Sequence, residues 1–152
     1  MVQVGERAPL FELTSDKGET VRLTDYLGHR VVLYFYPKAD TSGCTQQACA
    51  LRDAHPQIEA KDAVVIGISP DGLPALMAFR EKYDLPFVLL SDPDHAVAEA
   101  YGAWGEKTSY GKTYDGLIRS HFAIDAEGRL SDAEVSVKPL STADLALKLI
   151  EL

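Results

Sequence analysis

Cysteine is scarce in this chain, with two residues in 152, so the fold cannot depend on a network of disulfides. A chain of this length buries enough apolar surface for one full-sized core, and we expect a single domain over residues 1–152. In a reducing cytoplasm, two cysteines are either inert core residues or part of the protein's chemistry.

Basic residues are outnumbered, since 15 lysines and arginines stand against 23 aspartates and glutamates and leave a net charge of −8. This balance argues against nucleic acid or an anionic membrane as a partner. Long hydrophobic runs are also missing, because the longest, 31–36 and 63–68, fall far short of the roughly 18 residues of a membrane span. The N-terminal residues lack the pattern of a secretory signal, so we expect a cytoplasmic protein.

Strand-like and helix-like patterns alternate along the chain. Continuous apolar runs are typical of strands that are buried on both faces, and they occupy 31–36, 63–69 and 87–90. Helical spacing follows each run, over 44–60, 74–83 and 95–101. Two antiparallel pairs and a last helix complete the pattern: a hairpin around the turn 16–19, a pair formed by 117–124 and 130–135, and a helix that begins at Ser141.

This order of elements predicts an α/β protein with a thioredoxin-like arrangement. We expect a central, mostly parallel sheet with antiparallel edge strands, helices on both faces and an N-terminal hairpin. Within the helix at 44–60, Pro56 is expected to kink the helix or to end it early, because proline cannot donate the helical hydrogen bond.

Cys44 lies at the first turn of a predicted helix, directly after a buried strand and the loop 37–43. Ligands of open α/β sheets bind in the crevice beyond the carboxyl ends of the strands. The unpaired N–H groups and the dipole of a helix N-terminus favour a thiolate over a thiol, so Cys44 is placed to react. The alternative is a small buried hydrophobic residue, and the position alone leaves both readings open.

Cys49 follows five residues later on the same predicted helix. On a straight helix the two side chains diverge by about 140°, and their Cα atoms lie roughly 8.5 Å apart, beyond the ~7 Å limit for a disulfide. The two cysteines therefore cannot bond unless the helix first unwinds. The alternative for Cys49 is a core residue.

Neither a metal nor any other cofactor is expected. The cysteine spacing differs from the Cys-x-x-Cys of disulfide oxidoreductases, and the four histidines are scattered at 29, 55, 95 and 121. His55 lies eleven residues from Cys44, too far along a helix to act as its base. Activation of Cys44 must then come from backbone N–H groups and a cation that is distant in sequence.

The residues around Cys44 resemble a known family. The segment Pro37-x-x-x-Thr41-x-x-Cys44 is similar to the active-site signature of the peroxiredoxins. Its surroundings resemble the Q branch, also called bacterioferritin comigratory protein, whose second cysteine sits five residues after the first. Further similarity extends to the C-terminus, through the segments 89–92, 101–107, 111–116 and 119–125.

The resemblance implies a thiol peroxidase that reduces hydrogen peroxide and organic hydroperoxides. Cys44 resembles the peroxidatic cysteine, whose thiolate becomes a sulfenic acid. Cys49 resembles the resolving cysteine, which forms an intramolecular disulfide that thioredoxin reduces. The resemblance also implies a monomer without a cofactor.

Three more residues receive roles from the resemblance, and each also has a simpler explanation. Thr41 would hydrogen-bond the thiolate and the peroxide, although it could be only a helix cap. Arg119 would stabilise the thiolate and the developing charge, although it could pair with any carboxylate. Pro37 would shield the site, although its ring already explains the end of the strand.

Three positions depart from the family's pattern. Ser42 replaces the usual proline, which loosens the loop, and Ala50 replaces a common glycine, which stiffens the helix. His121 occupies a position that usually carries serine or threonine, and by the two-residue strand period it faces the same side as Arg119. We interpret His121 as a satisfied core histidine; the alternative is that it tunes the pH response of the site.

Two other functions remain open at this point. In the first, an external thiol resolves Cys44 and Cys49 only packs. In the second, the chain is a redox-sensing or holdase module that binds a partner when oxidised, because unwinding exposes apolar surface.

Overall fold

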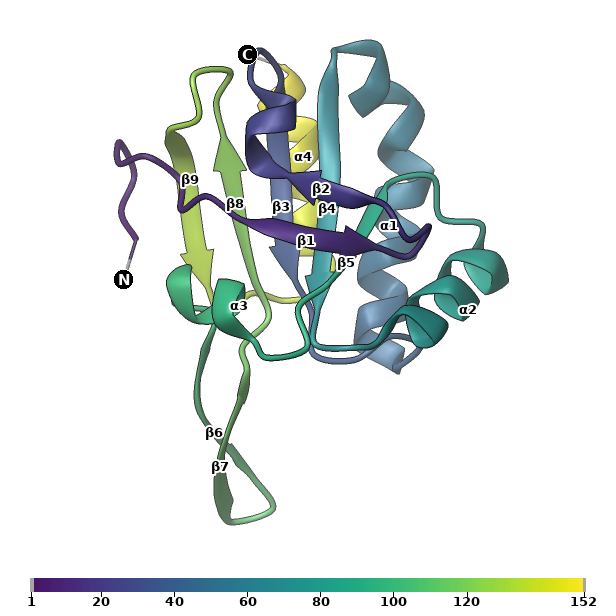
Figure 1. Cartoon of the computed structure of the whole chain (residues 1–152), viewed down its shortest axis with the longest axis vertical. Coiled ribbons are helices and arrows are strands. Elements are labelled where there is room, and N and C mark those ends of the chain that lie inside the picture. The colour runs from purple at the N-terminus through teal and green to yellow at the C-terminus, as the bar shows by residue number, and fades with distance from the viewer. Residues whose placement is uncertain (1, 152) are drawn as a thin grey trace.

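The computed structural model describes residues 2–151 and, within them, every side chain except that of Ser109 (Figure 1). The strands are β1 (Glu12–Ser15), β2 (Thr20–Arg22), β3 (Arg30–Phe35), β4 (Ala63–Ser69), β5 (Val88–Ser91), β6 (Trp104–Ser109), β7 (Lys112–Leu117), β8 (Ser120–Ile124) and β9 (Leu130–Val135). The helices are the 3-10 turn η1 (Leu23–Tyr26), α1 (Ser42–Ala60), α2 (Leu73–Tyr83), α3 (Ala96–Ala100) and α4 (Ser141–Ile150). None of the helices in this part of the chain is both long and apolar enough to cross a membrane.

One twisted sheet forms the centre of the molecule, with the strand order β2-β1-β5-β4-β3-β8-β9 (Figure 1). The three central strands β5, β4 and β3 are parallel, and the pairs outside them are antiparallel. The predicted thioredoxin-like arrangement is confirmed, including the N-terminal hairpin formed by β1 and β2. The parallel part is limited to the centre, since four of the six pairings within this seven-stranded sheet are antiparallel.

Helices cover both faces of the sheet. This arrangement explains why the sequence of β3 is continuously apolar. Val32 and Tyr34 pack into the core beneath α1, α2 and α4. Val31, Leu33 and Phe35 point the other way, into the core that contains α3 and the N-terminal segment. Because side chains alternate across a strand and both faces are covered, every position from 31 to 35 is buried.

Pro56 does not end α1, contrary to one of the two expectations for it, because the helix continues to Ala60. A proline inside a helix removes one hydrogen bond and costs about 3 kcal/mol. Leu51 and Ile58 flank this position and are completely buried against the sheet and α4. Burying two large aliphatic side chains stabilises a helix by a comparable or larger amount, so packing carries α1 past the proline.

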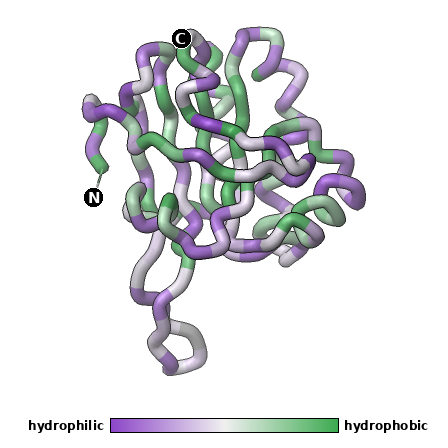
Figure 2. The backbone as a smooth tube through the Cα atoms, in the orientation of Figure 1, coloured by the Kyte–Doolittle hydropathy of each residue, from purple (hydrophilic) through white to green (hydrophobic). Residues whose placement is uncertain are grey.

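Strands β6 and β7 form a separate two-stranded arm, which extends from the body in Figure 1 and was not foreseen from the sequence. Its tip is a turn at Tyr110 and Gly111, both with positive φ, as in the type I′ turns that join hairpins. The predicted strand 117–124 is thus wrong in its first part, since β7 ends at Leu117 and β8 begins at Ser120. In Figure 2 the arm is mostly pale or purple, whereas green hydrophobic stretches gather in the central strands.

Candidate active site

Cys44 lies in the first turn of α1, where the chain has crossed from the carboxyl end of β3. Its side chain is only 1% exposed and packs in the core between α1 and the sheet. The carbonyl oxygen of Thr41 already accepts the first helical hydrogen bond from the N–H of Thr45, at 2.8 Å. Cys44 therefore sits among the N-terminal N–H groups of a 19-residue helix, which favours negative charge on its sulfur.

Arg119 reaches Cys44 from the short break between β7 and β8. Its Nη2 donates to the Cys44 sulfur at 3.4 Å, and its Nη1 donates to Oε1 of Gln47 at 2.7 Å. The Arg119 carbonyl accepts a hydrogen bond from the N–H of Val137 at 2.9 Å, which fixes the backbone at the break. The structure thus places a cation from 75 residues away beside Cys44. Such a distant cation was predicted from the sequence because no histidine lies near Cys44 along the chain.

Gly43 makes room for this guanidinium. A Cβ atom at this position would lie 2.9 Å from Arg119 Nη2 and 3.4 Å from Cγ of Pro139. The first of these distances is shorter than real Cβ contacts, so any larger residue at 43 must displace Arg119. From the sequence alone, Gly43 had no role beyond the entrance to the helix.

Gly43→Ala is expected to lower the rate of Cys44 with peroxide by roughly tenfold or more, because a misplaced cation stabilises the transition state less well. The same change is expected to keep the fold at full stability, since alanine suits a helix better than glycine by about 0.5–1 kcal/mol. Stopped-flow kinetics and denaturant unfolding measure the two effects. Gly72→Ala is the matched control, because a Cβ there meets only Cδ of Pro74, at 3.8 Å. An unchanged rate in Gly43→Ala would contradict the steric role.

Thr41 and Pro37 lie on the loop that leads to Cys44. Thr41 is the N-cap residue of α1, but its side chain makes no capping bond; its hydroxyl donates to the carbonyl oxygen of Lys38 at 2.8 Å. The structure does not bring this hydroxyl into a hydrogen bond with Cys44. Because its one proton is directed to Lys38, the Thr41 oxygen is left to act as an acceptor. Pro37 is half-buried and follows β3 after one intervening residue, Tyr36.

Cys49 is half-buried on the same unbroken helix as Cys44, and both thiols are free. The geometry of an intact helix keeps their Cα atoms roughly 8.5 Å apart, so the described state is one in which they cannot bond. A disulfide between them requires α1 to unwind in its first two turns.

Two polar residues close to this site, Gln47 and Thr142, were not predicted from the sequence, and both are fully buried. Gln47 Nε2 donates to Oγ1 of Thr142 at 2.9 Å. His121, which the sequence analysis singled out, is 1% exposed and lies 2.9 Å from the same hydroxyl through Nδ1 and 3.0 Å from Glu134 through Nε2. His121 is thus a histidine with a partner at each ring nitrogen. The available signal for Gln47 was its position three residues after Cys44, on the same helix face.

The aromatic neighbours of Cys44 contribute no charge. Tyr34 and Tyr36 are completely buried in the same core, and among the described residues their hydroxyl groups have no hydrogen-bond partner. Burial raises the pKa of Tyr34 well above its ordinary value, and it also raises the pKa of Tyr36. Both phenols therefore stay protonated, and the cation that faces the Cys44 sulfur is Arg119.

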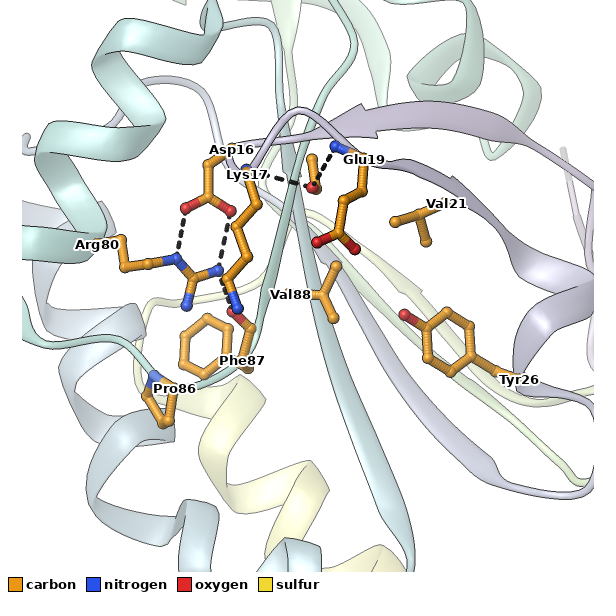
Figure 3. A pocket seen from close by; sticks show the side chains of 10 residues that line it. Asp16, Lys17, Glu19, Val21, Tyr26, Arg80, Pro86, Phe87 and Val88 are labelled. Atoms are coloured by element: carbon orange, nitrogen blue, oxygen red, sulfur yellow. Dashed lines mark hydrogen bonds and ion pairs between the residues drawn. The ribbon is translucent and has the colours of Figure 1, made fainter.

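A separate pocket of about 140 Å³ lies between the β1–β2 turn and the end of α2 (Figure 3). There Arg80 donates to the carboxylate of Asp16 and to the carbonyl oxygens of Leu85 and Phe87. These bonds tie the N-terminal hairpin to α2. The pocket contains no cysteine and shares no residue with the Cys44, Arg119 and Gln47 group, so we regard it as structural.

A buried cysteine held against a guanidinium at the start of a helix, on this sheet, defines a thiol-based redox protein of thioredoxin-like fold. The sequence pattern of the AhpC/TSA family matches residues 4–133. The chain belongs to this family, and within it to the Bcp or Q-type peroxiredoxins.

Relatives with curated names and solved structures agree with this membership. Peroxiredoxin Bcp of Bacillus subtilis is 51% identical over 129 residues, which are 85% of this chain and 82% of that protein. Peroxiredoxin Bcp of Escherichia coli is 47% identical over 146 residues, 96% of this chain and 94% of that protein. The bacterioferritin comigratory protein of Xanthomonas campestris, whose structures concern alkyl peroxide reduction, has a TM-score of 0.89 at 30% identity and covers 98% of each chain. A PrxQ variant from Xylella fastidiosa has a TM-score of 0.92 at 29% identity, over 99% of this chain and 96% of that one.

Proposed function

We propose that the protein is a thiol peroxidase that reduces hydrogen peroxide and organic hydroperoxides, with Cys44 as the peroxidatic cysteine. The observation that carries the proposal is the 3.4 Å contact between Arg119 Nη2 and the Cys44 sulfur at the first turn of α1. The guanidinium and the helix N-terminus both stabilise a thiolate, which is the nucleophilic form of cysteine. Membership in the Bcp branch supports the same reaction.

In the first step, the Cys44 thiolate attacks the terminal oxygen of the peroxide and the O–O bond breaks. The sulfur becomes a sulfenic acid, and the remaining oxygen leaves as water or an alcohol after it gains a proton. Arg119 is suited to stabilise the charge that develops on the leaving oxygen, since a fixed donor acts most strongly in a buried site. We assign Thr41 to accept a hydrogen bond from the peroxide O–H, and Pro37 to shield the sulfur from water.

In the second step, Cys49 attacks the sulfenic sulfur, water leaves, and a Cys44–Cys49 disulfide forms. A dithiol reductant, proposed to be thioredoxin, then restores both thiols through a mixed disulfide. The first turns of α1 must unwind for this step, and two of the three departures from the family's pattern act on it in opposite directions. Ser42 makes the start of α1 easier to unwind, whereas Ala50 favours the helical state.

All the proposed catalytic groups come from one chain, which supports action as a monomer. Cys44, Cys49 and Thr41 belong to α1 and its cap, and Arg119 lies between two strands of the same chain. We place the enzyme in the cytoplasm, where thiol reductants keep both cysteines reduced between turnovers.

The test of this cycle is turnover together with the oxidised product. Peroxide treatment is expected to form an internal disulfide, seen as a loss of two hydrogens by mass spectrometry, and to accelerate hydrogen exchange at residues 44–50. Cys49→Ser is expected to form the sulfenic acid at a normal rate but to lose steady turnover with thioredoxin and its reductase. The internal disulfide of the wild type and the lost turnover of Cys49→Ser have one cause, because only Cys49 can complete the disulfide within the chain.

Each alternative function has its own result in this test. If Cys49→Ser turns over normally and the wild type gains the mass of an external thiol, an external thiol resolves Cys44 and the two-cysteine cycle is wrong. If the wild type shows no steady turnover but binds partner proteins after oxidation, it is a redox sensor or holdase. Equal exchange at 44–50 in reduced and oxidised protein would refute the unwinding step.

A further inference from the structure

A continuous chain of hydrogen bonds runs from the site to the protein surface. It begins at the Cys44 sulfur, passes through Arg119 and Gln47, and continues at 2.9 Å to Thr142 on α4. From Thr142 it reaches His121 on β8 at 2.9 Å and ends on the carboxylate of Glu134 on β9, at 3.0 Å. Four secondary-structure elements thus meet along one line of polar contacts.

The bonds that Arg119 and Gln47 make in this chain each have one direction. Arginine can only donate, so the Gln47 atom that faces Arg119 must be the carbonyl oxygen, and its amide nitrogen then faces Thr142. The Thr142 oxygen accepts that bond, and its O–H can donate to Nδ1 of His121. The network assigns this histidine the tautomer with its proton on Nε2, which donates to the Glu134 carboxylate.

The middle of the chain is sealed from water. Gln47 and Thr142 are completely buried, and His121 is 1% exposed, whereas the side chain of Glu134 is 62% exposed. Buried hydrogen bonds are stronger than exposed ones, and a buried polar atom that loses its partner finds no water to replace it. The orientation of the Gln47 amide is therefore fixed from both ends.

We propose that Thr142 and His121 are positioning residues for Cys44, because they hold the Gln47 amide in the orientation that retains Arg119 on the thiolate. Neither residue touches the reacting atoms. They act through Gln47, which lies on α1 three residues after Cys44 and therefore also ties the first turns of that helix to α4 and β8. The inference deepens the proposed function and rests on it.

The role of Thr142 is to select one of the two orientations of the Gln47 amide through its hydroxyl group. If the Gln47 amide turned by half a rotation, its NH₂ group would face the guanidinium, and Arg119 would lose its acceptor. In the tautomer assigned above, the Thr142 proton is donated to Nδ1 of His121, 2.9 Å away, so the Thr142 oxygen is left to accept and favours the productive orientation. An apolar side chain at 142 removes that selection and leaves the Gln47 NH₂ group without a partner.

The test compares Thr142→Val, which removes the hydroxyl at nearly constant shape, with Thr142→Ser, which restores it. Both are made in a Cys49→Ser background so that Cys44 is the remaining thiol. The readouts are the pH profile of Cys44 alkylation by iodoacetamide and the rate of sulfenic acid formation with hydrogen peroxide. Loss of one buried hydrogen bond in the chain is expected to slow sulfenic acid formation roughly fivefold in Thr142→Val and to move the alkylation midpoint to higher pH. Thr142→Ser is expected to recover most of both.

Controls separate this inference from a general loss of stability and from the proposed function. Thr113→Val makes the same exchange at an exposed position of the arm, and it is expected to change neither readout. If Thr142→Val does not fold, Thr142→Ala replaces it, because alanine is the best helix former. The positioning role would be wrong if Thr142→Val and Thr142→Ser gave the same alkylation profile. It would also be wrong if Thr142→Val lowered only the free energy of unfolding and left both readouts unchanged. A wild type that consumes no peroxide would instead overturn the proposed function, and the alkylation profile would still report on Thr142.

Discussion

Cys44→Ser is expected to abolish peroxide consumption, with a fall in kcat/KM on the order of a thousandfold or more. A serine hydroxyl stays protonated at neutral pH and cannot pass through the sulfenic and disulfide states of the cycle. The Arg119 donor and the helix N-terminus remain in place in this variant, so the loss isolates the contribution of the sulfur itself. Steady-state consumption of hydrogen peroxide and of an organic hydroperoxide, with thioredoxin and with a small thiol, measures the effect.

The natural control is Cys49→Ser, because it is the same exchange on the same helix, five residues away. It is expected to keep a normal rate of sulfenic acid formation, which shows that the loss in Cys44→Ser is not caused by a damaged helix. Denaturant unfolding of the reduced variants checks that both keep the fold. If Cys44→Ser retained full activity, the whole assignment of the site would be wrong.

Much of the fold could be predicted because its central strands leave a direct mark in the sequence. Segments 31–36 and 63–68 are continuously apolar, and the structure buries every residue in them except the half-buried Val64 between two layers of helices. The expectation about Pro56 was less successful because the cost of a proline is local, whereas the packing of Leu51 and Ile58 that outweighs it is tertiary. The arm was missed for a related reason: its turn residues, Tyr110 and Gly111, differ from the Asn-Gly or Asp-Gly pairs that signal a hairpin.

The residues of the site also differ in how far the sequence around them predicts their place. Cys44 and Thr41 could be found because the strand, loop and helix that position them are contiguous in sequence. Arg119 was reached through the family resemblance, since nothing near it in the sequence points to a cysteine 75 residues away. Thr142 could not be distinguished from a surface residue, and the only signal for Gln47 was its place on the helix face of Cys44, because burial of a polar side chain is decided by its partners and not by its type.

Replacing Arg119 is expected to have the second large effect on the reaction with peroxide, because its guanidinium makes two hydrogen bonds in a fixed, forked geometry. One donor meets the Cys44 sulfur at 3.4 Å and the other meets Gln47 Oε1 at 2.7 Å. A lysine carries the charge but cannot reproduce the fork, and a methionine carries neither. The two variants therefore separate the contribution of charge from that of geometry.

Arg119→Met is expected to slow sulfenic acid formation by about 10²- to 10³-fold, the usual result of removing one donor that stabilises developing negative charge. The same variant leaves the buried Gln47 carbonyl without its partner, which lowers the free energy of unfolding by about 1–3 kcal/mol. Arg119→Lys is expected to lie between the methionine variant and the wild type in both measurements. Stopped-flow kinetics and denaturant unfolding provide the two numbers.

Arg22→Met is the control for the loss of an arginine as such, because Arg22 pairs with Glu12 on the exposed side of the N-terminal hairpin, where an ion pair contributes little. It is expected to react with peroxide at the wild-type rate. If Arg119→Met also reacted within about threefold of that rate, below what the loss of one such donor costs, the thiolate would have to be stabilised by the helix N-terminus alone. If Arg119→Lys matched the wild type, the charge would suffice, and the fork that joins Cys44 to Gln47 would have no part in the chemistry. A rate for Arg119→Lys between those of Arg119→Met and the wild type would show that both bonds of the guanidinium contribute, since charge alone would have restored the full rate.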